Sequence, residues 1–175
     1  MPRGGPNGSI TMSTALPRIV LDTNACLDLW VFRDPRAAAL LAALDDGAIE
    51  AVTNTDCRDE WLRVLHYPQL RLGDGQRIAH AAAYDALVRR LPDDSRPLVA
   101  DVALPRCADP DDQKFLLLAL ASGARWLISR DGDVLALGRR TRRDGLFEIV
   151  SPQGWAQWST LGSADNAGSG GSRQG

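Results

Sequence analysis

The sequence predicts an α/β fold in which helices cover both faces of a central parallel sheet of four to five strands. Two observations support this expectation. Short apolar runs, among them RIVLD at 18–22 and WLIS at 126–129, have the length and composition of buried parallel strands. Segments with the apolar spacing of helices separate these runs, and strands that alternate with helices favour a three-layer α/β/α sandwich.

Local signals place the elements in the first half of the chain. A loop with Trp30 and Pro35 follows the first strand, and an Ala- and Leu-rich helix then ends near Gly47. Thr53 to Thr55 supplies N-cap chemistry for the next helix, and Pro68 lies just beyond its end. We therefore expect helices at 36–45 and 55–65 and strands at 18–22 and 48–53.

The second half continues the alternation. A helix at 77–91 leads into a Pro- and Asp-rich connection, 92–110, which includes a candidate strand at 98–104. A strongly apolar helix at 111–122 then ends at Gly123. We expect the remaining elements to be strands at 126–129 and 146–150, a short helix at 133–137 and a final helical turn at 152–158, where Trp155 and Trp158 close the edge of the core.

These elements form one domain, which we place at 18–160. A chain of 175 residues is long enough to bury a single core. Residues 1–17 lack the apolar stretch of a secretory signal and are expected to be a flexible leader, with Met12 an alternative start. Residues 161–175 are rich in Gly and Ser and are expected to be a disordered tail.

Composition narrows the class of protein. The sequence is 45% hydrophobic and 24% charged, as in ordinary globular domains. No apolar run is long enough to span a membrane, so we expect no membrane association. Three cysteines without CxxC spacing, Cys26, Cys57 and Cys107, favour reduced thiols in a cytoplasm. With a net charge of −2, the chain has no overall positive charge to attract nucleic acid. This does not exclude a nuclease, because carboxylates gathered to bind metal ions would themselves make the chain more acidic.

Acidic residues at the ends of predicted strands are the strongest functional signal. Asp22 ends the first strand and is followed by Thr23 and Asn24, while Asp131 and Asp133 follow WLIS. The carboxyl ends of parallel strands meet in one crevice, where such folds bind ligands. Carboxylates gathered there would repel one another without a cation, and hard divalent cations take oxygen ligands. The sequence therefore predicts a Mg²⁺- or Mn²⁺-dependent enzyme acting on phosphates, although an Asx-turn or a helix cap would also explain these residues.

Two further acidic segments have structural explanations of their own. Glu60 lies within a helix, where it can be a solvated residue or an ion-pair partner of Arg63. The segment Asp109-Pro110-Asp111-Asp112 combines an N-cap, a proline at N1 and acids in the first turn, all of which stabilise a helix start. The apolar helix behind it must be buried, which would hold this acidic start in one place. Capping and chemistry are therefore both open for Asp109 and Asp112.

Other chemistries find little support in the sequence. His66 and His80 lack zinc-site spacing, and there is neither a nucleophile elbow nor a P-loop. A run of arginines follows Asp131 and Asp133 closely and could steer a nucleic-acid backbone into the site. An ordinary solvated surface is the commoner explanation for such a run. This run consists of Arg139, Arg140, Arg142 and Arg143.

Four motifs, taken in their order along the chain, resemble those of the PIN (PilT N-terminus) domain family. They are VLDTN at 20–24, EWLRVL at 60–65, DPDDQKFLLLALA at 109–121 and LISRDGDVL at 127–135. The resemblance covers roughly residues 18–158, and each motif alone is weakly specific. Within the family, the chain is similar to the branch described as toxin components of toxin–antitoxin systems.

The resemblance implies a PIN-like fold and a nuclease that depends on Mg²⁺ or Mn²⁺ and usually cuts single-stranded RNA. It also implies a partner antitoxin and allows a homodimer. The cation would lower the pKa of a bound water and neutralise charge on the scissile phosphate, leaving 5′-phosphate and 3′-hydroxyl ends. Glu60 would act on the cation through water, and the four catalytic acids would be Asp22, Glu60, Asp112 and Asp131.

The same resemblance gives supporting roles to two polar residues. Asn24 and Ser129 would assist the acids, with Ser129 standing where a threonine is more usual but keeping the hydroxyl. Three more carboxylates, Asp109, Asp111 and Asp133, could share the third or fourth acidic role, so Asp109 and Asp133 are also candidate metal ligands.

Other functions match part of the pattern. A small-molecule phosphohydrolase of the haloacid-dehalogenase type would need Asp-x-Asp where this chain has Asp22 and Asn24. A Toprim-like enzyme matches Asp131-Gly132-Asp133 but expects a glutamate in place of Asp22, and a receiver domain expects a lysine near the last strand, whereas the only lysine is Lys114. The non-enzymatic alternative is a PIN-like module that binds RNA or a partner without cutting, and the intact set of acids argues against it.

Overall fold

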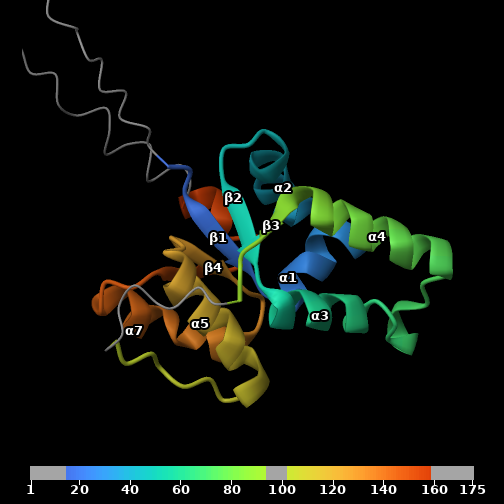
Figure 1. Cartoon of the computed structure of the whole chain (residues 1–175). Helices are drawn as coiled ribbons and strands as arrows, with labels where there is room; N and C mark the ends of the chain where they lie inside the picture. Colours follow the sequence, from blue (N-terminus) through green and yellow to red (C-terminus); the bar gives the residue numbers. More distant parts are fainter. Residues whose placement is uncertain (1–14, 94–101, 159–175) are drawn as a thin grey trace, which may run out of the picture.

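Five parallel strands form one sheet, in the order β3-β2-β1-β4-β5, in the computed structural model of the chain, which describes residues 15–93 and 102–158 (Figure 1). In the centre of the sheet, Ile19 lies opposite Ala51 on one side and Trp126 on the other. The predicted parallel sheet is therefore confirmed. The strands are β1 (Arg18–Leu21), β2 (Glu50–Thr53), β3 (Val88–Arg90), β4 (Trp126–Ile128) and β5 (Glu148–Val150).

Alternating side chains of the strands divide the core into two layers. Ile19 and Leu21 pack against helices on one face of the sheet, whereas Val20 packs against helices on the other. The first layer contains α1 (Thr23–Cys26), the π-helical turn η1 (Leu27–Val31), α2 (Ala38–Asp45) and α4 (Asp74–Leu87). The second contains α5 (Gln113–Ser122), α6 (Gly132–Ala136) and α7 (Gly138–Arg143). Figure 1 shows α4 and α5 on opposite sides of the sheet, as a three-layer α/β/α sandwich requires.

The helix α3 (Thr55–Val64) contributes to both layers, through Trp61 to the first and Cys57 to the second. Asn54 caps it, because its Oδ1 accepts the N–H of Cys57 at 3.0 Å. The helix α5 ends at Gly123, whose φ of 65° is a left-handed conformation that glycine adopts without strain. The described residues also contain three short 3₁₀ turns: η2 (Pro35–Ala37), η3 (Pro68–Leu70) and η4 (Pro110–Asp112).

The edge strand β3 corrects one prediction. The helix expected at 77–91 is α4, and the chain continues from it directly into β3. Only Val88 of this strand is buried, while Arg89 and Arg90 are exposed, so the segment lacks the apolar character that predicts a strand. The candidate strand at 98–104 falls partly outside the described residues, and its described part, 102–104, has no regular structure.

The segment 23–35, which we expected to be a loop, is mostly helical. The helix α1 begins directly after Asp22, and η1 extends it by a π-helical turn. Trp30 of η1 anchors this segment, because its ring centroid lies 5.5 Å from that of Tyr84 and 6.1 Å from that of Trp61. Aromatic burial of this kind stabilises a helical turn that local sequence signals do not predict.

The helix α7 is another element that the sequence patterns do not predict. Gly138 lets it approach β5 closely, because a Cβ at that position would lie 3.3 Å from the carbonyl oxygen of Ile149. The final helical turn is present at 155–158, and Trp155 is buried edge-on against Trp126, as a core residue should be.

The expected leader and tail lie almost entirely outside the described residues. Cys26 and Cys57 are buried in the core and all three cysteines are free thiols. Within residues 15–93 and 102–158, no helix combines the length and the apolar composition needed to cross a bilayer.

Candidate active site

Asp22 lies at the carboxyl end of the central strand and is 3% exposed. Its N–H donates to the carbonyl of Ile128 at 2.9 Å, and its Oδ2 accepts the Ser129 hydroxyl at 2.7 Å. Burial raises the pKa of Asp22, the Ser129 hydrogen bond lowers it, and the charges of Glu60 and Asp131 raise it again. The ends of β1 and β4 are therefore joined through a buried carboxylate.

The two residues expected to support Asp22 both contact it. Asn24 donates from Nδ2 to Asp22 Oδ2 at 3.3 Å, and its Oδ1 accepts the N–H of Arg130 at 2.8 Å. Ser129, which is fully buried, accepts the N–H of Asp131 on the same hydroxyl that donates to Asp22, at 3.1 Å. These bonds fix the position of Asp131 relative to Asp22.

Asp131 has the capping role that the sequence left open, and it also lies near the other acids. Its Oδ1 accepts the N–H groups of Asp133 at 2.8 Å and of Val134 at 3.3 Å, which starts α6. Its charge nevertheless raises the pKa of both Asp22 and Asp112. The Asp133 side chain is exposed on the first turn of α6.

Two residues of the acidic segment before α5 have different roles: Asp109 caps a helical turn, and Asp112 is a partly buried carboxylate. Asp109 is exposed, and its Oδ1 accepts the N–H of Asp111 at 2.9 Å, as an N-cap of η4 does. Asp112 is partly buried, and burial together with the charges of Asp22, Asp109 and Asp131 raises its pKa to about 6. Asp112 therefore lies in the same electrostatic environment as Asp22, while Asp111 is exposed to solvent.

Glu60 approaches the same place from α3, and its charge raises the pKa of both Asp22 and Asp112. Its side chain is 19% exposed and forms an ion pair with Lys114 of α5, which is 24% exposed. The expected partner, Arg63, is not the one that Glu60 uses. One feature of the sequence could have indicated this pairing: Lys114 is the only lysine in the sequence, and it lies two residues after Asp112.

The four predicted acids thus come from four different parts of the chain, and α3 contacts both α1 and α5 around them (Figure 1). Carboxylate oxygens suit a hard divalent cation, and such a cation would oppose the repulsion that raises the pKa of Asp22 and of Asp112. Among the described residues, no three His, Cys, Asp or Glu side chains are close enough together to hold a metal ion. The donor chemistry therefore fits a metal, and the carboxylates would have to move together to coordinate it.

An ion pair between a buried aspartate and a partly exposed arginine, which the sequence did not suggest, lies beside the site. Arg130 donates from Nη1 to Asp28 Oδ1 at 2.9 Å, and Asp28 is only 1% exposed. Gln153 approaches the other oxygen of Asp28 at 3.4 Å. Since Arg130 also bonds Asn24 through its N–H, the loop between Ser129 and Asp131 is tied to α1 and η1 at two points.

Cys107, in the segment before η4, lies close enough to the acids for their charges to act on its thiol. Burial, followed by the charges of Asp112, Asp22 and Asp131, raises its pKa to about 11. Gln113 holds this segment, because its Oε1 accepts the N–H of Cys107 at 2.8 Å. The thiol is therefore protonated at neutral pH.

The arginines proposed to steer nucleic acid lie on α7, where three of them pair with nearby acids. Arg142 donates to Glu148 at 2.7 Å, Arg143 to Asp144 at 3.0 Å, and Arg140 lies 3.7 Å from Asp144. Arg139 is exposed. These pairs reduce the positive charge that the run presents to a ligand.

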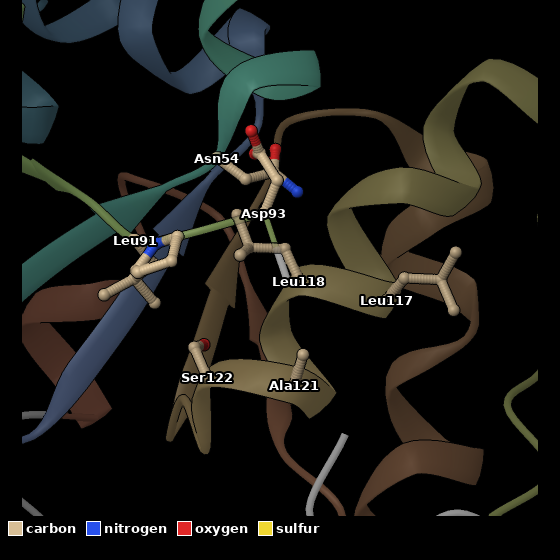
Figure 2. Close-up of a pocket in the computed structure, with 8 residues that line it drawn as sticks. Asn54, Leu91, Asp93, Leu117, Leu118, Ala121 and Ser122 are labelled. Carbon is tan, nitrogen blue, oxygen red and sulfur yellow. The ribbon is translucent and has the colours of Figure 1, made fainter. Parts of the chain in front are cut away.

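A shallow pocket beside α5 lies apart from the acids. Its volume is about 180 Å³, and Leu91, Leu117 and Leu118 contribute to its apolar wall. Figure 2 shows Asn54 and Asp93 together at one end of it. None of the four predicted acids lines this pocket, so it is separate from the acidic site.

The fold and the site together define a class: α/β sandwiches that gather carboxylates at the carboxyl edge of a parallel sheet. Comparison with known families matches residues 18–133 to the PIN domain. The chain belongs to the PIN domain family, whose members are generally metal-dependent nucleases. The matched region includes all four predicted acids and ends before α7. No curated protein gives a significant match to the chain.

Proposed function

We propose that the chain is a Mg²⁺- or Mn²⁺-dependent endoribonuclease that hydrolyses phosphodiester bonds in single-stranded RNA. The observation that supports this most strongly is that Asp22, Glu60, Asp112 and Asp131 share one electrostatic environment although they come from distant segments. Negative charges that lie close together and partly buried repel one another, and the repulsion is offset when a cation binds.

The residues of the site have separate tasks in this proposal. Asp22, Asp112 and Asp131 would hold the cation, and Asp109 and Asp133 are alternative ligands. When bound, the cation activates a water molecule and neutralises charge on the phosphate. Ser129 and Asn24 keep the Asp22 carboxylate in a fixed orientation through the bonds to its Oδ2.

The biological setting that we propose is a toxin–antitoxin system, with the chain as the toxin. The resemblance of the four motifs to that branch of the family supports this setting, a cognate antitoxin and a homodimer. If the proposal is correct, expression of the chain alone should arrest bacterial growth, and Asp22→Asn should relieve the arrest. Growth that is equally poor with the Asp22→Asn variant would count against a nuclease toxin.

The activity itself is tested with labelled oligonucleotides of single-stranded RNA and DNA. Cleavage should require Mg²⁺ or Mn²⁺, should stop with EDTA, and should favour RNA. The RNA products should carry 5′-phosphate and 3′-hydroxyl ends. RNA that is bound but not cut with either metal would instead indicate a non-catalytic PIN-like module, and hydrolysis of only small phosphate esters would indicate a phosphohydrolase.

A further inference from the structure

Lys114 is an unusual residue for its position. It lies in the first turn of α5, where the positive end of the helix dipole disfavours a cation. Its side chain is only 24% exposed, and its ammonium lies 5.5 Å from the centroid of the Phe115 ring. Helix stability does not explain a lysine at this position. An acidic partner on a neighbouring element would explain it, because it would stabilise the charge of the ammonium.

That partner is Glu60, which faces Lys114 from α3. The Glu60 side chain is 19% exposed, and its Oε2 atom is buried. The ion pair with Lys114 therefore offsets the negative charge on this oxygen. The negative charge of Glu60 is thus already offset by a neighbouring ammonium, which lowers its need for a metal ion.

The remaining three acids have no such partner. Among the described residues, Asp22, Asp112 and Asp131 form no ion pair with an arginine, a lysine or a histidine. Neutral side chains and backbone N–H groups do bond to two of them: Ser129, Asn24 and the N–H of Thr23 to Asp22, and the N–H groups at the start of α6 to Asp131. The site is thus divided into one carboxylate with an ion-pair partner and three without one among the described residues.

We propose that Lys114 acts as a fixed cation that limits the site to a single divalent metal ion. This inference rests on the proposed function. Asp22, Asp112 and Asp131 would hold that ion, while Lys114 occupies the place beside Glu60 that a second ion would need. A second divalent cation would have to displace the ammonium of Lys114 or lie in contact with it. Two positive charges in contact repel each other strongly when they are partly buried.

The test is calorimetric titration of the metal-free protein with Mn²⁺ alone, without RNA. We expect one Mn²⁺ per chain for the wild type and two for Lys114→Met, because Met keeps the length of the side chain and removes its charge. Lys114→Arg keeps the charge and should still bind one. The double variant Glu60→Gln, Lys114→Met removes both partners and should return to one, which locates the second ion at Glu60.

Two results would overturn the inference: two Mn²⁺ ions in the wild type, or one in Lys114→Met when its circular dichroism matches that of the wild type. A folded wild type that binds no Mn²⁺ and does not cut RNA would contradict the proposed function itself. Because the titration contains no substrate, the stoichiometry and the nuclease activity are measured independently.

Discussion

The hydroxyl of Ser129 donates to Oδ2 of Asp22 at 2.7 Å and joins the carboxyl ends of β4 and β1. Burial raises the pKa of Asp22, and this bond opposes that effect because it favours the charged form of the carboxylate. It connects two residues 107 positions apart in the chain. The relationship shows how the sheet converts two short sequence motifs into one site.

Removal of this bond should weaken metal binding and activity. In Ser129→Ala the pKa of Asp22 rises further, so the acid limb of the pH–activity profile should move to higher pH. A hydrogen bond to a charged group contributes about 1.5–3 kcal/mol, so kcat/KM should fall roughly 10- to 100-fold. Ser129→Thr is the matched control, because it keeps the hydroxyl. An unchanged pH profile in Ser129→Ala would show that the bond does not tune Asp22.

Asp112 should destabilise the metal-free protein at neutral pH. Its pKa is about 6 in the fold and 3.8 as an ordinary carboxyl group, so the folded state binds the proton more tightly than the unfolded state. The stability associated with this proton is fully present below pH 3.8 and is lost as the pH rises through about 6. Asp112→Asn should therefore raise the Tm in EDTA at neutral pH and change it little at acid pH. A lower Tm at neutral pH would contradict this electrostatic account.

The thiol of Cys107 should report the charge of the site. Only a thiolate reacts with iodoacetamide, and the pKa of about 11 makes this form scarce. Since Asp112 is the first of the charges that raise this pKa, Asp112→Asn should accelerate alkylation, and so should Mn²⁺. Mass spectrometry of the Cys107 peptide measures the rate, with buried Cys26 as an internal control. Equal rates with and without Mn²⁺ would mean that no cation binds near this thiol.

The ion pair between Asp28 and Arg130 should support both the fold and the site. Asp28 is 1% exposed and Arg130 is 45% exposed, so the pair is screened on one side only. Truncation of one partner of a fully buried pair costs about 3–5 kcal/mol, and a smaller loss of about 1–3 kcal/mol is expected for Asp28→Asn. Urea unfolding measures this loss, and Mn²⁺ affinity should also fall because the Ser129–Asp131 loop is released. Full retention of both properties would show that the pair is dispensable.

The sequence predicted the sheet and the place of the acids because both depend on local patterns. A buried strand that ends in a carboxylate, such as the one before Asp22, must deliver that carboxylate to the edge of a parallel sheet. The edge strand β3 was not predictable in this way, because Arg89 and Arg90 face solvent and resemble the end of the preceding helix. The π-helical turn η1 depends on the packing of Trp30 against Tyr84, which is a contact distant in sequence.

The parts of the site that the sequence did not reveal are those made by pairing across elements. Composition alone left Glu60 as a solvated residue or a partner of Arg63, and only the family resemblance made it one of the four acids. The meeting of α3 with α5, which brings it to Lys114, was not predicted. The choice between Asp109 and Asp112 was open because both fit a helix start. The structure gives Asp109 the capping bond and leaves Asp112 partly buried among the acids.

The most direct test of the central claim compares two adjacent acids in one RNA cleavage assay. Asp112→Asn removes a partly buried carboxylate near Asp22, whereas Asp111→Asn removes an exposed one of the same chemistry and serves as its matched control. With Mn²⁺ and labelled single-stranded RNA, we predict that Asp111→Asn cuts like the wild type and that Asp112→Asn loses nearly all activity. Full cleavage by Asp112→Asn would contradict the account, because an acid that the fold places in the site would then have no part in the reaction.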